Sequence, residues 1–338
     1  MRKPTLADIA RKAGVGTATV ERVLNGRGGV RPAMAERVIT AARALGYSRR
    51  LPEVHRGLVR IEIIFARPET ALFRRLTRAF ERISATLDPI VRIHRTFAKE
   101  NDPAGTAALI ASREHRRAGL ILGVPDDPLI RAAVAESAPE LPLIHVVTRA
   151  HDTIGDLVGI DNYAAGRSAA MFISRMQTRP GNVMAICHPI YHVHRERMRG
   201  FSDYFAEHPR ADLAFSWTAF GRDNPETASE LLFQALRADP GLAGLYNVGA
   251  ANPALIDLLR RAPRPGLFYV GHELTEFTAA ALRDGVMHVV LDQAPEAQAR
   301  RAIDLMMNRL GLLDIPPDTA PIQFITLTAE NVHRVQRS

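Results

Sequence analysis

The sequence predicts a small all-α domain at the N-terminus, followed by a larger α/β part with parallel sheets arranged in two lobes. A chain of 338 residues exceeds the size of one ordinary core. Basic charge is confined to its start: residues 1–60 hold 13 Arg and Lys against four Asp and Glu, whereas the remainder has a net charge of −1. From residue 60 onward, apolar strand-like segments alternate with helical ones, which favours parallel sheets covered on both faces.

Residues 1–47 contain three predicted helices. Thr5 can cap the first, with Asp8 three residues later, and Gly14 ends it. The second spans about 17–24, with Val20, Val23 and Leu24 facing inward. The third opens at Pro32 and stops at Gly46. The first two helices have the helix-turn-helix layout, whose second helix lies in the major groove of DNA.

Residues 48–59 show no sustained period and contain Pro52 and Gly57, so we interpret them as a linker. Residues 60–338 then form the α/β core. Nine strands are predicted, which suggests two sheets with a cleft between them; they span 61–66, 91–97, 119–124, 143–148, 182–188, 213–220, 244–248, 267–271 and 288–291. One lobe would comprise about 60–161 with 292–325, and the other 162–291.

Composition narrows the class of protein. No apolar run approaches the roughly 18–20 residues that span a bilayer, and the N-terminus shows no apolar signal segment, so we expect a cytoplasmic protein. The single Cys187 excludes an internal disulfide. His188, His192 and His194 resemble a metal site, but Pro189 breaks the helical spacing, so neither a metal nor a cofactor is expected.

The N-terminal motif is specific. Thr5-Leu6-x-Asp8-Ile9-Ala10-x-x-Ala13-Gly14-Val15, followed by Thr19-Val20-x-Arg22-Val23-Leu24-Asn25 and Ala42-x-x-Leu45-Gly46-Tyr47, resembles the headpiece of the LacI/GalR family of bacterial transcription regulators. Gly159-Ile160-Asp161-Asn162, Arg197-x-x-Gly200-Phe201, Tyr246-Asn247, Val270-Gly271-His272-Glu273 and Asp292-Gln293 resemble that family's effector-binding core, a type I periplasmic-binding-protein fold. The resemblance implies a homodimer that binds a palindromic operator and a small effector, often a sugar.

The resemblance also implies a set of DNA-binding residues. Thr17, Ala18 and Arg22 would face base edges, where Arg pairs with guanine and small side chains meet the thymine methyl group. Thr5 and Arg31 would contact phosphates, as would Arg49 and Arg50 in the linker; Asn25 completes the set. Glu21 replaces the family's usual Ser and could accept from a cytosine amino group or pair with Arg22. The linker lacks the usual hinge-helix pattern, because Pro52 breaks a short helix; Leu51 is the one candidate for a minor-groove wedge.

Effector contacts are expected where strands end. Arg197, Asn247, Glu273 and Gln293 match family positions that contact the effector, and Asp161, Arg149 and Phe73 are added from location. Asp161 could instead cap a helix, and Glu273 could cap the helix that follows Leu274. If Arg67, Arg149, Arg195 and Arg197 converge, the effector would be an anionic sugar acid or phosphosugar; otherwise these side chains are solvated or paired with acids.

These features predict a DNA-binding, ligand-responsive transcription regulator that acts as a repressor. The sequence has no Gly-x-x-x-x-Gly-Lys loop, Gly-x-Ser-x-Gly elbow or His-Glu-x-x-His pair, so we expect no enzymatic activity. The alternatives are a sugar-processing enzyme or a solute-binding protein with an appended DNA-binding module.

Overall fold

The chain forms two compact units, residues 1–59 with 88–90, and the rest of the chain. The computed structural model describes residues 4–25, 30, 32–47, 58–114, 116–313 and 318–332. Each unit has its own hydrophobic core. Among the described helices, none is both long and apolar enough to cross a membrane.

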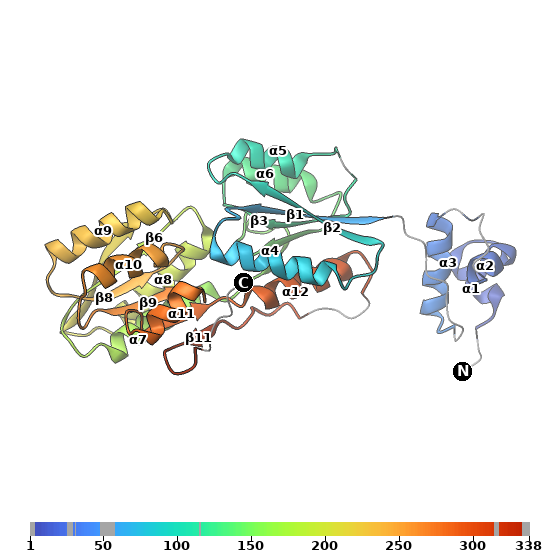
Figure 1. Cartoon of the computed structure of the whole chain (residues 1–338). Helices are drawn as coiled ribbons and strands as arrows, with labels where there is room; N and C mark the ends of the chain where they lie inside the picture. The colour runs from blue at the N-terminus through green and yellow to red at the C-terminus, as the bar shows by residue number, and fades with distance from the viewer. Residues whose placement is uncertain are drawn as a thin grey trace. The chain divides into compact units, whose positions relative to one another are not determined.

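The N-terminal unit contains α1 (Leu6–Ala13), α2 (Thr17–Leu24) and α3 (Pro32–Ala44) (Figure 1). Thr5 and Asp8 form the predicted capping box at the start of α1. Gly14 follows α1 with a φ of 63°, a left-handed conformation that glycine adopts without steric cost. Arg37 on α3 holds this turn, since its guanidinium donates to the carbonyls of Ala13 and Gly14 at 3.0 Å each. The three predicted helices are confirmed, and Arg37 connects α3 to the turn between α1 and α2.

The first sheet has the strand order β2-β1-β3-β4-β5 and forms what we call the first lobe. Strands β1, β3, β4 and β5 run parallel. Figure 1 shows α5 and α6 on one face of this sheet and α4 and α12 on the other. The bounds are β1 (Val59–Ala66), β2 (Val91–Ala98), β3 (Gly119–Gly123), β4 (Leu143–Val146), β5 (Asp156–Val158), α4 (Ala71–Ser84), α5 (Pro103–Ala111), α6 (Pro128–Ser137) and α12 (Pro295–Arg309).

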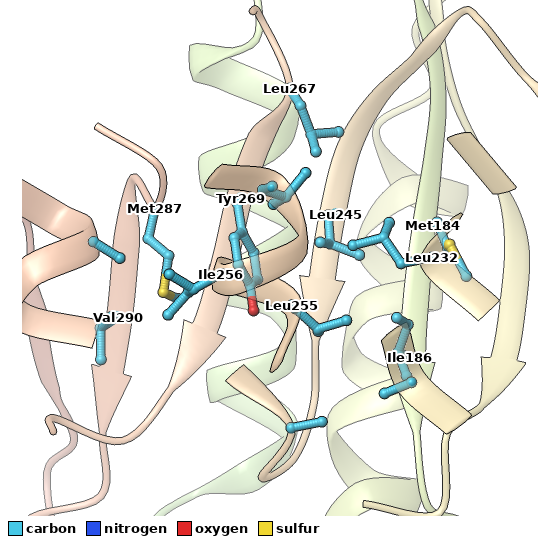
Figure 2. Close-up of a cluster of buried hydrophobic side chains, with 14 of the residues drawn as sticks. Met184, Ile186, Leu232, Leu245, Leu255, Ile256, Leu267, Tyr269, Met287 and Val290 are labelled. Atoms are coloured by element: carbon cyan, nitrogen blue, oxygen red, sulfur yellow. The ribbon is translucent and has the colours of Figure 1, made fainter. Parts of the chain in front are cut away.

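The second sheet has the order β11-β10-β9-β8-β6-β7 and forms the second lobe; β11 alone is antiparallel to its neighbour. Successive strand residues face opposite sides. Leu245 therefore joins a core with α9, α10 and α11 (Figure 2), whereas Tyr246 stacks on Phe201 of α8. The bounds are β6 (Gly181–Cys187), β7 (Leu213–Phe220), β8 (Leu242–Asn247), β9 (Phe268–His272), β10 (Val289–Asp292), β11 (Ile325–Leu327), α7 (Asn162–Met176), α8 (His192–Glu207), α9 (Pro225–Ala238), α10 (Asn252–Arg261) and α11 (Glu276–Arg283).

The nine predicted strands are confirmed within two residues at each end. Strand β1 begins at Val59, one residue inside the predicted linker. Residues 48–57 of that linker lie outside the described residues. Strands β5 and β11 are not predicted by the sequence, because three residues are too few to show an alternating pattern. The chain passes between the lobes where β5 leads into α7, where β10 leads into α12, and again between α12 and β11.

Candidate functional site

Helix α2 presents a continuous polar face to solvent. Thr17, Ala18, Glu21 and Arg22 are all exposed, whereas Val20 packs into the headpiece core and is fully buried. Within the described part of the chain, no ion pair joins Glu21 to Arg22. Both side chains therefore remain available to a partner, and the helix that the sequence assigns to the major groove is free along that face.

The other predicted DNA-binding residues differ in whether their side chains are free of internal hydrogen bonds and in whether the structure describes them. Asn25 is exposed at the C-terminal end of α2. Thr5 is exposed, but its hydroxyl is already engaged, because it donates to Asp8 Oδ2 at 2.7 Å. Arg31, Arg49 and Arg50 lie outside the described residues.

A large cavity lies between the two lobes of the second unit. Its volume is about 1060 Å³, at the upper end of the range typical of small-molecule sites. Residues that follow the carboxyl ends of strands of both sheets form its wall, among them Arg67 after β1, Thr148 after β4, His188 after β6 and Glu273 after β9. Such edges are where ligands bind in parallel α/β sheets, and the position matches the prediction.

The cavity wall holds an unusual concentration of backbone strain. Among the described residues, six that are not glycine have a positive φ. Five of them line the cavity: Arg67 at 56°, Val147 at 70°, Arg222 at 52°, Asp223 at 50° and Glu273 at 72°. Left-handed backbone is costly for such residues, most of all for a β-branched valine, and it gathers at functional sites. The strain is a second, independent observation that makes this cavity the candidate functional site.

Three buried polar side chains meet in the cavity wall. Arg197 on α8 donates from Nε to Asn162 Oδ1 and from Nη1 to the carbonyl of Val248, both at 2.8 Å, while Nη2 has no partner. Gln293 donates from Nε2 to one oxygen of Glu273. The second carboxylate oxygen of Glu273 and the amide oxygen of Gln293 are both buried and without partners. Buried polar atoms normally have hydrogen-bond partners, so these atoms are suited to a polar ligand.

Burial is the main cause of the pKa shifts of Glu273 and Arg197. Burial raises the pKa of Glu273 to about 7, helped by the nearby negative charge of Asp292 and opposed by Arg197. Burial also lowers the pKa of Arg197, although a guanidinium stays protonated at physiological pH. A cation and a titratable carboxyl therefore face the same cavity, and together they can accept and donate hydrogen bonds to hydroxyl groups.

A second polar cluster links the two lobes. Arg67 of the first lobe donates from Nη2 to the carbonyl of Asp223 in the second lobe at 3.1 Å. Its Nη1 lies 3.3 Å from Asp223 Oδ2 and 3.6 Å from Glu100 Oε1. Glu100 also accepts from the hydroxyl of Tyr191, across the lobes. Burial alone would lower the pKa of Arg67, but Asp223 and Glu100 raise it, so this arginine is firmly charged and paired.

Aromatic side chains complete the cavity. Phe73 is buried in the wall and packs on Phe65 with ring centroids 5.1 Å apart. Phe220 and Phe277, each 57% exposed, also line the cavity. Flat apolar faces beside polar groups suit ligands that carry both C–H faces and hydroxyls, and such a combination is common in small-molecule sites.

Four of the seven predicted effector residues line this cavity, namely Arg197, Glu273, Gln293 and Phe73. Glu273 does not cap a helix, because α11 is capped by Thr275. The other three need correction. Asp161 caps α7 by accepting from the Ala164 amide at 2.8 Å. Asn247 lies behind the wall, where it donates to Asn252 Oδ1 at 2.7 Å.

Arg149 is the third correction. It donates to the carbonyl of Asp152 and lines a separate, smaller pocket. Of the two alternatives for the arginines near strand ends, pairing with acids holds for Arg195, which pairs with Asp126 at 2.7 Å, and for Arg67, which pairs as described above. Arg197 and Arg67 are the two described members of that set that line the cavity and keep a buried donor atom without a hydrogen-bond partner, but Arg67 lies within ion-pair distance of Asp223 and Glu100.

Sequence reasoning missed several cavity residues. Glu100 follows β2 and Asp223 follows β7, so the rule used for the other strand ends would have found both. Phe277 and Asn252 lie in first turns of helices, and no local signal distinguishes them from ordinary helix residues.

The histidine-rich loop forms hydrogen bonds within the protein. The amide of His188 donates to Nδ1 of His194 at 3.0 Å, and burial lowers the pKa of His194 to about 4. Burial raises the pKa of Cys187 to about 11. In the described part of the chain, no group of three or more His, Cys, Asp or Glu side chains is placed to hold a metal ion.

Comparisons with known proteins match both parts of the chain. Residues 5–50 match the family of bacterial regulatory proteins, lacI family, and residues 108–311 match the periplasmic binding protein domain. The HTH-type transcriptional regulator MalR of Streptomyces coelicolor is 52% identical over 56 residues, a match that spans 16% of either chain.

Two solved structures show the same fold as the core. An ABC transporter solute-binding protein from Burkholderia graminis, in complex with D-arabinose, is 15% identical, with 83% of this chain and 99% of that chain covered and a TM-score of 0.74. One from Agrobacterium vitis, bound with α-D-tagatopyranose, is 18% identical, with 81% and 96% covered and a TM-score of 0.72. The chain thus belongs to the periplasmic binding protein domain family and carries a lacI-family helix-turn-helix domain at its N-terminus.

Proposed function

We propose that this protein is a sequence-specific DNA-binding transcription regulator, acting as a repressor, whose operator affinity is controlled by a small carbohydrate bound between its lobes. One observation carries the proposal. A single chain combines a helix-turn-helix with an exposed polar face on α2 and an α/β core with a cavity lined by open hydrogen-bonding groups. An enzyme or a transport protein does not require a helix-turn-helix with an exposed polar face. A constitutive DNA-binding protein does not require a ligand cavity.

At the DNA end, α2 would enter the major groove. Arg22 would read guanine, and Thr17 and Ala18 would meet thymine methyl groups. Arg31, Arg49 and Arg50 would contact phosphates, a role supported by the net charge of +9 over residues 1–60. Two copies of the chain would form a homodimer that places two headpieces on a palindromic operator.

At the effector end, hydroxyl groups of a sugar would pair with Arg197 Nη2, Glu273 Oε2 and Gln293 Oε1, the buried atoms without partners. The aromatic rings of Phe220 and Phe277 would cover an apolar sugar face. Binding would shift the population of lobe arrangements and, with it, the headpiece spacing that fits two half-sites. The chain would act in the cytoplasm, where its DNA target lies, and without catalysing a reaction.

The test begins with thermal denaturation of the full chain in the presence of neutral sugars, polyols and sugar acids. A ligand that binds the folded state raises the melting temperature by mass action. The stabilising compound is then added to the protein on DNA fragments selected from a random pool. We expect selective binding that changes with the compound, that Arg22→Ala loses, and that the matched control Lys12→Ala on α1 keeps. Stabilisation without any effect on DNA binding would refute the regulatory function.

A further inference from the structure

The cationic side chain of Arg67 is neutralised by one acid from each lobe. Arg67 and Glu100 belong to the first lobe, Asp223 to the second, and all three line the cavity. Their side chains are only 13%, 18% and 11% exposed. Ion pairs so shielded from water are screened far less than surface pairs. A ligand that sought Arg67 would first have to displace a carboxylate.

Among the described residues that line the cavity, the buried side-chain atoms without hydrogen-bond partners include both acceptors and donors. Glu273 Oε2 and Gln293 Oε1 are acceptors without a partner, and Arg197 Nη2 is a donor without a partner. Arg67 Nη1 also lacks a hydrogen-bond partner, but it lies within ion-pair distance of Asp223 and Glu100. The amide of Gln293 is oriented by its donation to Glu273, which leaves its oxygen available. A hydroxyl group can both donate and accept, so it satisfies this set. A carboxylate or phosphate can only accept and would leave the two oxygens unsatisfied beside a negative charge.

We propose that the effector is an uncharged polyhydroxy compound, and that Glu100 and Asp223 determine this specificity by occupying Arg67. This inference rests on the proposed function, in which the cavity is the effector site. The two carboxylates act as selectivity residues against anionic carbohydrates, and Arg67 holds the lobes together instead of binding ligand.

Isosteric amide variants remove the charges and keep the contacts. In Asp223→Asn the carbonyl oxygen can still accept from the Ala250 amide, and the backbone contact to Arg67 is untouched. In Glu100→Gln the oxygen can still accept from Tyr191. The two substitutions together remove both buried carboxylates from Arg67 and leave it with the exposed Glu69 as its acidic partner. Charge-assisted hydrogen bonds to a free guanidinium are strong, so we expect this charge to attract carboxylate and phosphate groups.

The chain offers a matched control. Glu69 also pairs with Arg67, at 3.2 Å from Nε, but its side chain is 66% exposed. A carboxylate in contact with water contributes little to such a pair. Glu69→Gln therefore removes one charge from the same arginine and is expected to leave ligand selectivity unchanged.

The experiment measures binding of the full chain by calorimetry and thermal shift at pH 8, where Glu273 is ionised. The probes are a set of neutral aldoses, ketoses and polyols, together with the matching uronates, aldonates and sugar phosphates. The proteins are wild type, E69Q, E100Q, D223N and the E100Q/D223N double variant. The fluorescence of Trp217 checks that each variant is folded; if the double variant fails to fold, the two single variants carry the test.

We expect wild type and E69Q to bind neutral probes and not anionic ones. The double variant should gain affinity for an anionic probe by about tenfold or more, with smaller gains in each single variant and neutral binding within threefold of wild type. Tighter binding of an anionic probe by wild type, or no gain in the folded variants, would overturn the specificity proposal while leaving a ligand sensor intact. Absence of binding by every probe to every protein would overturn both this proposal and the proposed effector site.

Discussion

Glu273 makes the stability of the core depend on pH in a direction that the structure fixes. Its carboxyl is buried in the cavity wall, one oxygen lacks a partner, and Asp292 adds negative charge nearby. Burial, the largest effect, raises its pKa from the ordinary 4.5 to about 7. A group whose pKa is higher in the folded state stabilises that state at low pH, and the stabilisation is lost as the pH rises through 7. Glu273→Gln removes this dependence, because the amide stays neutral.

The magnitude follows from the rise in pKa from 4.5 to about 7. A tenfold change in proton affinity is worth about 1.4 kcal/mol, so the full effect is roughly 3 kcal/mol, of which most is expressed between about pH 5 and pH 8.5. The free energy of unfolding of wild type should therefore fall relative to that of Glu273→Gln by roughly 2–3 kcal/mol over this range. Other titrating groups, such as His194, are present in both proteins and cancel in the difference.

The assay is urea denaturation of the ligand-free full chain at a series of pH values. Trp217 is the single tryptophan of the sequence and lies on β7, so its fluorescence follows unfolding of the core and not of the headpiece. The quantity of interest is the difference in unfolding free energy between variant and wild type at each pH. A difference that stays constant from pH 5 to pH 8.5 would refute the reasoning, because Glu273 would then have an ordinary pKa in the folded state.

Three further predictions concern specific contacts. Arg22→Ala should abolish sequence-selective DNA binding without changing the circular dichroism spectrum, since the side chain is exposed; unchanged selectivity in a binding assay would remove Arg22 from base readout. Gly166→Ala should lower the free energy of unfolding of the core, measured in urea, by at least about 1–3 kcal/mol, because the new Cβ would lie 1.9 Å from the carbonyl oxygen of Arg197. A variant as stable as wild type would show that α7 and α8 can separate at little cost. Arg37→Ala should lower headpiece stability by about 1–3 kcal/mol, since it leaves carbonyl groups at the Gly14 turn without their donor; an unchanged thermal transition of the headpiece, followed by NMR, would contradict that role.

The headpiece could be predicted in detail because its signals are local. The capping pair Thr5 and Asp8, the left-handed Gly14 and the N-terminal Pro32 each act within a few residues of where they stand. The strands of the core were equally visible, because a strand buried on both faces is a continuous apolar run. Strands of three residues carry no such run, so β5 and β11 were missed.

The cavity was predicted only in part, because its contacts are not local. Arg67 and Asp223 are 156 residues apart, and nothing in either neighbourhood shows that they pair. Asn247 and Gln293 both stand at strand ends, yet the first donates to Asn252 behind the wall and the second lines the cavity. A strand end fixes where a residue lies on the sheet edge. The ion-pair and hydrogen-bond partners of that residue depend on side chains from the other lobe.

The central claim is that the cavity controls DNA binding, and fluorescence anisotropy of the full chain on its selected DNA site tests it most directly. The titration is carried out without and with a saturating amount of the sugar that stabilises the protein. We expect the sugar to change the Kd for DNA by at least about fivefold. Saturating DNA should change the Kd for the sugar by the same factor, since coupling of two binding sites is reciprocal. Equal DNA affinities with and without bound sugar would contradict it.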